Sequence, residues 1–235
     1  REQLSGNYNQ AGWYIAHTNE AMRELKYITE GQLNKTPDDT TFTLSSGNKN
    51  FSPQFSPLFS DDDCTAINAD WRTTLNTLGG FLHYWESQYV SSYEMSRIFL
   101  LNSGSNCLAT FSFSTSEVNQ DTSTNSLQEN VLRFHNSSAA EQRNPVYWIE
   151  PGNQPGVGAF YMMMPVYTGN QPVALLSFEQ NLRLDELVTP GGVPVTTSIV
   201  DDDDQLMLST DRTITSQMFD NLPDDKQWFG YLDGY

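Results

Sequence analysis

The chain has 235 residues, of which 29 are Asp or Glu and 12 are Lys or Arg, giving a formal net charge of -17. Because such an acidic surface repels nucleic-acid phosphates and anionic lipids, we expect no nucleic-acid binding and no direct binding to an anionic membrane. No run of about 18 apolar residues occurs, so the sequence predicts no membrane span. The chain begins without an initiator Met, and we expect it to be a segment of a longer protein.

Two apolar stripes predict long helices in the first 90 residues. The first helix is expected from Leu4 to about Leu33 and the second over 67–89, each about 45 Å long. A polar, proline-punctuated surface loop without regular structure is expected between them. The first stripe has the spacing of a coiled-coil seam, with candidate pairing residues Tyr8, Ala11, Ile15, Met22 and Leu25. Two alternatives stay open for this seam, namely pairing with a second subunit and packing within the chain.

After Val90 the pattern changes to short β-rich runs separated by turn residues. The runs cover 97–101, 107–113, 146–150, 159–167 and 172–180, and a helix is expected near 126–135. The last three runs are too close together for crossover helices, so they predict antiparallel pairing. We therefore expect an α+β fold with long helices packed on a five-stranded antiparallel sheet within residues 1–180.

Residues 181–235 predict a smaller α+β unit. It contains a short helix from Asn181, a Pro-Gly turn and two strands, over 195–200 and 205–210. A unit of this size has a thin core, so it either leans on the first domain or lacks its last strand. The acidic run 201–204 predicts a hairpin turn rather than a metal site, because four consecutive carboxylates cannot all face one ion.

The cysteines and histidines point to no reactive site. Cys64 and Cys107 lack the spacing of zinc ligands, so they either form a disulfide in an oxidising compartment or remain buried free thiols. His17, His83 and His135 are scattered and form no readable triad, and no GxSxG motif occurs. We expect no catalytic residues and no metal ligands in this segment.

Several motifs carry a resemblance to a known family: "MRELKYITE", "FSPLFSDDDC", "YWIEPGNQPGVGAFY", "PGGVPV" and "WFGYLDGY". In this order they resemble the periplasmic sensor region of the hybrid sensor histidine kinase of the Rcs phosphorelay in enteric bacteria. The resemblance spans about Met22 to Tyr235. It implies a periplasmic segment of an inner-membrane protein in a Gram-negative bacterium, which relays envelope stress and regulates capsule synthesis and motility.

The resemblance also implies partners and cofactors. The partners are the phosphotransfer protein RcsD and other envelope components. A homodimer is not implied by the resemblance and belongs to the alternative in which the coiled-coil seam pairs with a second subunit. The phosphorylated His and receiver Asp of this family lie in cytoplasmic domains, so the segment itself is expected to be non-catalytic. No cofactor is expected within it, while ATP is implied for the absent kinase domain.

The fold implied by the resemblance is a PAS-like, or Cache, sensor domain. Residues 1–180 would form the membrane-distal domain and residues 181–235 a smaller membrane-proximal unit, of which a further strand is expected past Tyr235. Alternation along 159–167 makes both faces of that strand apolar, so it should be covered on both sides. The long helices would cover one face, while a small ligand, or simply the short helix and loops, would cover the other.

A small-ligand-binding Cache receptor is therefore the alternative function. Its pocket residues would be Tyr147, Trp148, Tyr161, Met163 and Tyr167. Against this alternative, Arg143 lies five residues before Trp148, so the RxW pair of amino-acid-binding Cache domains is absent. Arg97, Arg133 and Arg143 also look isolated in the sequence, which predicts no anion site.

Overall fold

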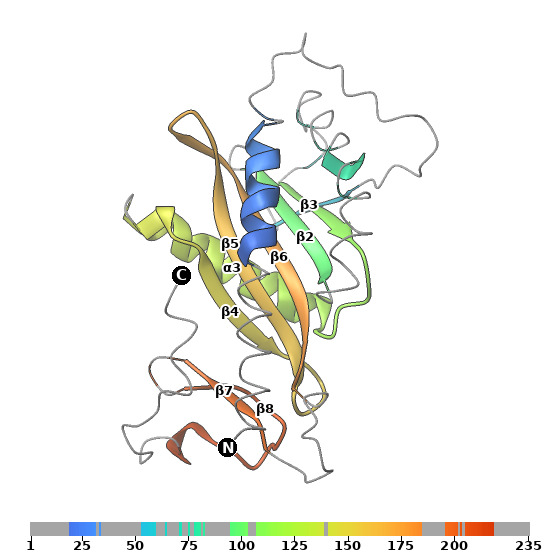
Figure 1. Ribbon diagram of the computed structural model, residues 1–235, viewed down its shortest axis with the longest axis vertical. Helices are drawn as coiled ribbons and strands as arrows, with labels where there is room; N and C mark the ends of the chain where they lie inside the picture. The colour runs from blue at the N-terminus through green and yellow to red at the C-terminus, as the bar shows by residue number, and fades with distance from the viewer. Residues whose placement is uncertain are drawn as a thin grey trace.

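An antiparallel sheet with helices on both faces organises the chain (Figure 1). The computed structural model describes residues 19–31, 33, 53–59, 64, 71, 75, 78–80, 82, 95–102, 107–138, 141–184, 196–201, 203 and 205–218. Helical residues 19–31 lie in front of the sheet in Figure 1, and helix α3 (Gln120–Asn136) lies behind it. The described residues also contain two short 3-10 helices, η2 (Glu141–Arg143) and η4 (Ser216–Met218).

The main sheet has six strands in the order β1-β3-β2-β6-β5-β4, and every neighbouring pair is antiparallel. The strands are β1 (Gln54–Pro57), β2 (Met95–Asn102), β3 (Cys107–Ser112), β4 (Val146–Pro151), β5 (Val157–Thr168) and β6 (Gln171–Arg183). The five predicted strands are all present. The pairing of β2 with β6 joins the early hairpin β2–β3 to the later meander β4–β5–β6.

Two predictions of local structure were wrong. The sheet has a sixth strand, β1, within the predicted loop, and it pairs with β3 at the edge of the sheet. The prolines on both sides of "QFS" favoured a loop in the sequence, but an edge strand tolerates them. Residues 181–183 were expected to begin a helix but extend β6, because they pair with Val157–Ala159 of β5. In both places long-range strand pairing overrides the local pattern.

Strand β5 separates two apolar clusters, as its sequence predicted. Phe160, Met162 and Met164 belong to the cluster on the face of residues 19–31, which we call the front core. Tyr161 and Met163 belong to the cluster under α3, which we call the back core. Ten consecutive residues of β5 are buried, so this strand is covered on both sides.

The described helical residues of the N-terminal part pack against the sheet. Met22 and Leu25 are 1% and 0% exposed within the front core. This burial matches the alternative in which the stripe packs within the chain. Tyr8, Ala11 and Ile15 lie outside the described residues. The expected lengths of the two helices are not supported, because the first is described only at 19–31 and 33.

The second stripe is described at only a few positions. Its residues Trp71, Leu75, Leu78 and Leu82 are helical and buried in the front core, at the spacing that predicted a helix.

Helix α3 is the predicted third helix, extended at its beginning. The expected apolar face of Leu127, Val131 and Phe134 is buried in the back core. The helix starts at Gln120 rather than near Ser126, because the side chain of Asn119 accepts a hydrogen bond from the backbone N–H of Asp121 and caps the first turn. In the described residues, no helix combines the length and the apolarity that a membrane crossing requires.

The C-terminal part of the chain contains a hairpin of β7 (Ser198–Val200) and β8 (Leu206–Ser209). Between the strands, the carboxylate of Asp201 accepts hydrogen bonds from the backbone N–H groups of Asp203, 3.0 Å, and Gln205, 2.8 Å. The described residues of the acidic run, Asp201 and Asp203, therefore lie in the predicted hairpin turn. Leu208 of β8 belongs to the front core, so this hairpin leans on the main sheet.

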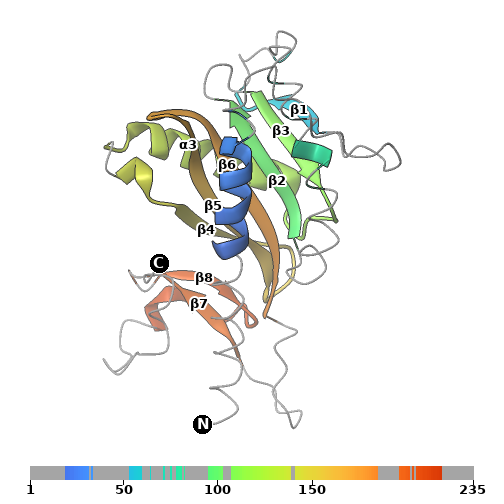
Figure 2. The same cartoon turned by 45° about the horizontal axis from the view of Figure 1, so that its top comes forward.

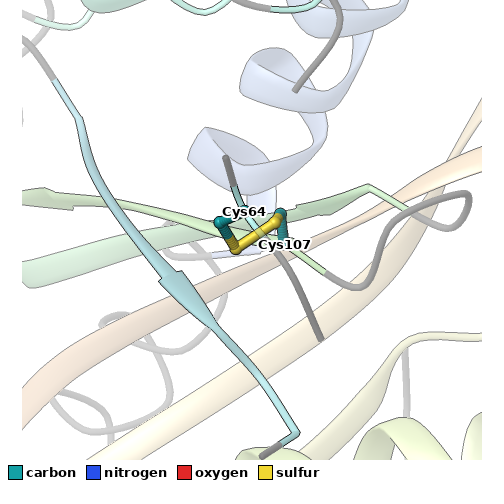
Figure 3. Close-up of a disulfide and its surroundings, with 2 residues drawn as sticks. All are labelled: Cys64 and Cys107. Atoms are coloured by element: carbon teal, nitrogen blue, oxygen red, sulfur yellow. A yellow bond between two sulfur atoms is a disulfide. The ribbon is translucent and has the colours of Figure 1, made fainter. Parts of the chain in front are cut away.

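A disulfide joins Cys64 to Cys107, the first residue of β3 (Figure 3). Its Cα atoms are 5.5 Å apart, and Cys107 is fully buried. The bond ties the segment between β1 and the second helical stripe to the sheet. The sequence left open a disulfide or two free thiols, and the structure contains the disulfide.

We predict that the double variant Cys64→Ser/Cys107→Ser loses up to about 4 kcal/mol of unfolding free energy, because the bridge closes a loop with a sequence separation of 43. Urea unfolding of the chain and the variant would measure this loss. Reductant should lower the midpoint of the parent chain and leave that of the variant unchanged. Rapid labelling of both thiols in the folded, unreduced parent would contradict the bridge.

Candidate functional site

A buried ion pair lies at the centre of the sheet, on the face covered by α3. Arg97 of β2 and Glu179 of β6 are directly paired in the strand register. The Nε of Arg97 donates to Oε1 of Glu179 at 2.8 Å, and its second nitrogen, Nη2, bonds Oε2. Glu179 is 0% exposed and Arg97 9%. A bidentate pair at this depth is held far more rigidly than a surface pair.

Hydroxyl groups complete the hydrogen bonding of this carboxylate. Ser96 donates to Oε1 and the phenol of Tyr161 donates to Oε2. Ser123 of α3 donates to Oε2 at 3.3 Å and accepts from Arg97 at 2.9 Å. Ser96 lies at the bulge between Met95 and Arg97, which lets two consecutive side chains of β2 reach the same carboxylate.

The charges and hydroxyls set one another's pKa values. Burial alone would raise the pKa of Glu179, but the hydrogen bonds and charge of Arg97, with the hydroxyls of Ser96 and Tyr161, lower it overall. Burial and the neighbouring negative charge of Glu179 raise the pKa of Tyr161. Glu179 is therefore the charged acceptor, and Tyr161 is a neutral donor at every physiological pH.

Aromatic side chains enclose the ion pair. Trp148 of β4 stacks on Tyr161 with a centroid separation of 4.8 Å and an interplanar angle of 2°. The indole N–H of Trp148 donates to the hydroxyl of Ser126 on α3 at 3.1 Å. The guanidinium of Arg97 lies 5.1 Å from the ring centre of Phe99. This buried network, which we call the Arg97–Glu179 network, fastens α3 to three strands of the sheet.

The five predicted pocket residues do not converge on one site. Trp148, Tyr161 and Met163 lie in the back core under α3. Tyr147 lies on the front face, where its hydroxyl donates to the side chain of Asn19 at 3.0 Å. Tyr167 was expected on the same face as Tyr161 and Met163.

The position of Tyr167 differs because of a bulge. The register between β5 and β6 shifts between Val166 and Tyr167. The ring of Tyr167 lies 5.5 Å from Nζ of Lys26, and its backbone N–H donates to Glu30 at 2.9 Å. Tyr167 is therefore fixed against residues 19–31 in front of the sheet, and a single pocket containing all five residues is not formed.

The network holds α3 against the sheet through hydrogen bonds that involve Ser123 and Ser126. Both oxygens of Glu179 are satisfied by protein donors. Within the described residues, no group of three or more His, Cys, Asp or Glu could hold a metal ion. His135 is exposed on α3, and His17 and His83 lie outside the described residues.

Sequence reasoning missed this network because it treated Arg97 as isolated. The two charges are 82 positions apart in the chain, so no local motif contains both. A signal was nevertheless present, since "MSRIFLL" and "VALLSFEQ" each carry a charge inside an apolar run. A charge in a strand that is buried on both faces requires an opposite partner, and these two runs could supply one another.

Comparison with known proteins shows a likeness over the whole chain. The chain is 32% identical over 238 aligned residues to the sensor histidine kinase RcsC of Salmonella typhimurium (strain LT2), of Salmonella typhi and of Escherichia coli (strain K12). The alignment covers 100% of this chain and 25% of each relative, so the chain spans about a quarter of their length. No protein-family model matches the chain. The resemblance seen in the motifs is confirmed.

We predict that Glu179→Gln costs about 3–5 kcal/mol of unfolding free energy, because it leaves the buried Arg97 without a counter-charge. The double variant Arg97→Met/Glu179→Leu should be much closer to the parent. The matched control is the pair of Arg183 and Glu117, 3.2 Å apart with side chains 32% and 34% exposed. Its removal should cost at most about 1 kcal/mol. Equal losses of unfolding free energy for the two pairs would contradict the prediction that breaking the buried pair costs more than removing the exposed pair.

The pH dependence of stability follows from the same carboxylate. Because the pKa of Glu179 is lower in the folded chain than in the unfolded one, its stabilisation is full above the unfolded value, about 4.3, and is lost as the pH falls. Burial raises the pKa of Glu150, so protonation of Glu150 has the opposite effect and stabilises the fold as the pH falls.

We therefore predict that Glu179→Gln flattens the loss of unfolding free energy between about pH 6 and pH 3.5. Glu150→Gln should make the loss steeper. Urea midpoints measured across this pH range would separate the effects of the two substitutions. Identical slopes of stability against pH in both variants would rule out the opposite roles assigned to Glu179 and Glu150.

Proposed function

We propose that this chain is the sensory segment of a two-component sensor histidine kinase and that it relays envelope stress across the inner membrane through protein contacts. The observation that carries this proposal is the 32% identity along the entire chain to one quarter of the RcsC kinases. Such partial coverage is what a separate sensor module within a longer receptor gives. The segment would lie in the periplasm, and the disulfide between Cys64 and Cys107 supports an oxidising compartment.

The arrangement of the sheet favours contacts with proteins over a small ligand. Helix α3 fills the back face with Leu127, Val131 and Phe134, and the Arg97–Glu179 network is satisfied by protein groups. The candidate pocket residues divide between the two faces of the sheet. We therefore place the small-ligand receptor second, and we keep the PAS-like, or Cache, assignment as part of the proposal.

The remaining parts of the proposal concern the whole receptor. Phosphotransfer from ATP would take place in a kinase domain outside this segment, in a relay with RcsD and other envelope components. The segment would bind no cofactor and carry out no bond-making step itself. Pairing of two copies would use surfaces other than Met22 and Leu25, because these side chains are buried in the front core.

A segment exchange in cells tests the sensory role. In Escherichia coli carrying a capsule-promoter reporter, the matching quarter of RcsC would be replaced by this chain or by an unrelated periplasmic domain of similar length. We expect the first chimera to retain at least part of the induction by envelope stress, because the fold and its contacts are shared. The second should lose the response.

Immunoblots would establish equal amounts of the two chimeras, and reporter activity without stress would show that each kinase is functional. An undiminished stress response with the unrelated domain would remove the sensory role from this segment.

A further inference from the structure

The turn between β4 and β5 connects two parts of the chain that are distant in sequence. Gly156 donates its N–H to the carbonyl of Ser209 at the end of β8, 2.6 Å, and accepts from the N–H of Leu184, 2.7 Å. The N–H of Gly156 is thus bonded to the β7–β8 hairpin, and its carbonyl is bonded to Leu184, the residue that follows β6. Figure 2 shows the hairpin at the end of the sheet where this turn lies.

The same turn packs against the segment that leads into α3. A Cβ atom on Gly152 would lie 2.8 Å from the carbonyl oxygen of Glu117, so the two backbones approach as closely as glycine allows. Glu117 in turn donates its N–H to the side chain of Asn181 at 3.1 Å. Two residues further along the chain, Asn119 caps α3.

Side-chain contacts strengthen the junction with the hairpin. Leu184 and Leu208 are both buried in the front core. Arg212, which follows β8, donates to the carbonyl of Asn153 in the turn at 2.5 Å. The turn therefore touches both the hairpin and the segment that leads into α3.

We propose that the turn Gly152–Gly156 is a coupling joint, which makes the position of the β7–β8 hairpin and the seating of α3 on the sheet interdependent. A displacement of the hairpin breaks the bonds of Gly156 and Arg212 and shifts the turn. Because Gly152 is in tight contact with Glu117, the shifted turn disturbs the cap of α3. The helix then loses the geometry that places Ser123 between Arg97 and Glu179. This coupling goes beyond the proposed sensory role and does not depend on it.

Hydrogen exchange of the 235-residue chain tests the joint without any signalling assay. Gly156 has a φ of 74°, so Gly156→Ala strains the turn. We expect exchange at roughly fivefold higher rates both in the hairpin and in residues 123–127 of α3. Strands β2 and β3 should change less.

Gly169→Ala is a matched control, because Gly169 has a φ of 60° and nothing lies within 4 Å of a Cβ placed there. It imposes similar backbone strain in the β5–β6 turn, away from the hairpin. Faster exchange in the hairpin with α3 unchanged would overturn the proposal. Equal acceleration of α3 in the two variants would also overturn it, because it would show global unfolding instead of coupling.

A milder variant keeps the test available if Gly156→Ala does not fold. Arg212→Ala removes one exposed side chain and its bond to Asn153. We expect about twofold faster exchange in the hairpin and in the first turns of α3. An effect limited to the hairpin would contradict the coupling. These measurements concern only the folded chain, so a failure here leaves the segment-exchange result unaffected.

Discussion

The pairing of β2 with β6, which places Arg97 opposite Glu179, determines how the main sheet is assembled. It joins the early hairpin to the later meander and brings two opposite charges into the dry centre of the sheet. Neither charge tolerates such burial alone. The register of the sheet, the bulge at Ser96 and the position of Ser123 on α3 therefore have to agree with one another.

The free energies of apolar burial and of the buried ion pair show which of the two stabilises the contact of α3 with the sheet. Burial of Leu127, Val131 and Phe134 contributes about 1.5–3 kcal/mol for each side chain. A buried ion pair is close to neutral compared with apolar residues of the same shape, because desolvation offsets the attraction. The apolar face therefore supplies most of the stability of the contact, and the Arg97–Glu179 network selects one seating of the helix.

Much of the fold could be predicted from local patterns. Alternation in "AFYMMMPVY" identified a strand buried on both faces, and the spacing of Leu127, Val131 and Phe134 identified α3. The turn at Asp201 followed from its acidic run. The wrong predictions concern residues whose structure depends on distant strands. Strand β1 forms by pairing with β3, and residues 181–183 are extended because they pair with β5. The bulge that places Tyr167 on the other face of the sheet has no sequence signature. The Arg97–Glu179 pair was missed for the same reason, since a pair across strands has no local motif.

Helix α3 and the Arg97–Glu179 network cover the back core of the sheet, so we expect no small molecule between the helix and the strands. A crystal structure of the 235-residue chain, purified without denaturation or reduction, would test this arrangement. We expect Arg97 to be bonded to Glu179 and to Ser123, with α3 packed on β4, β5 and β6. Electron density for a small molecule between α3 and the sheet, with this pair separated, would contradict it.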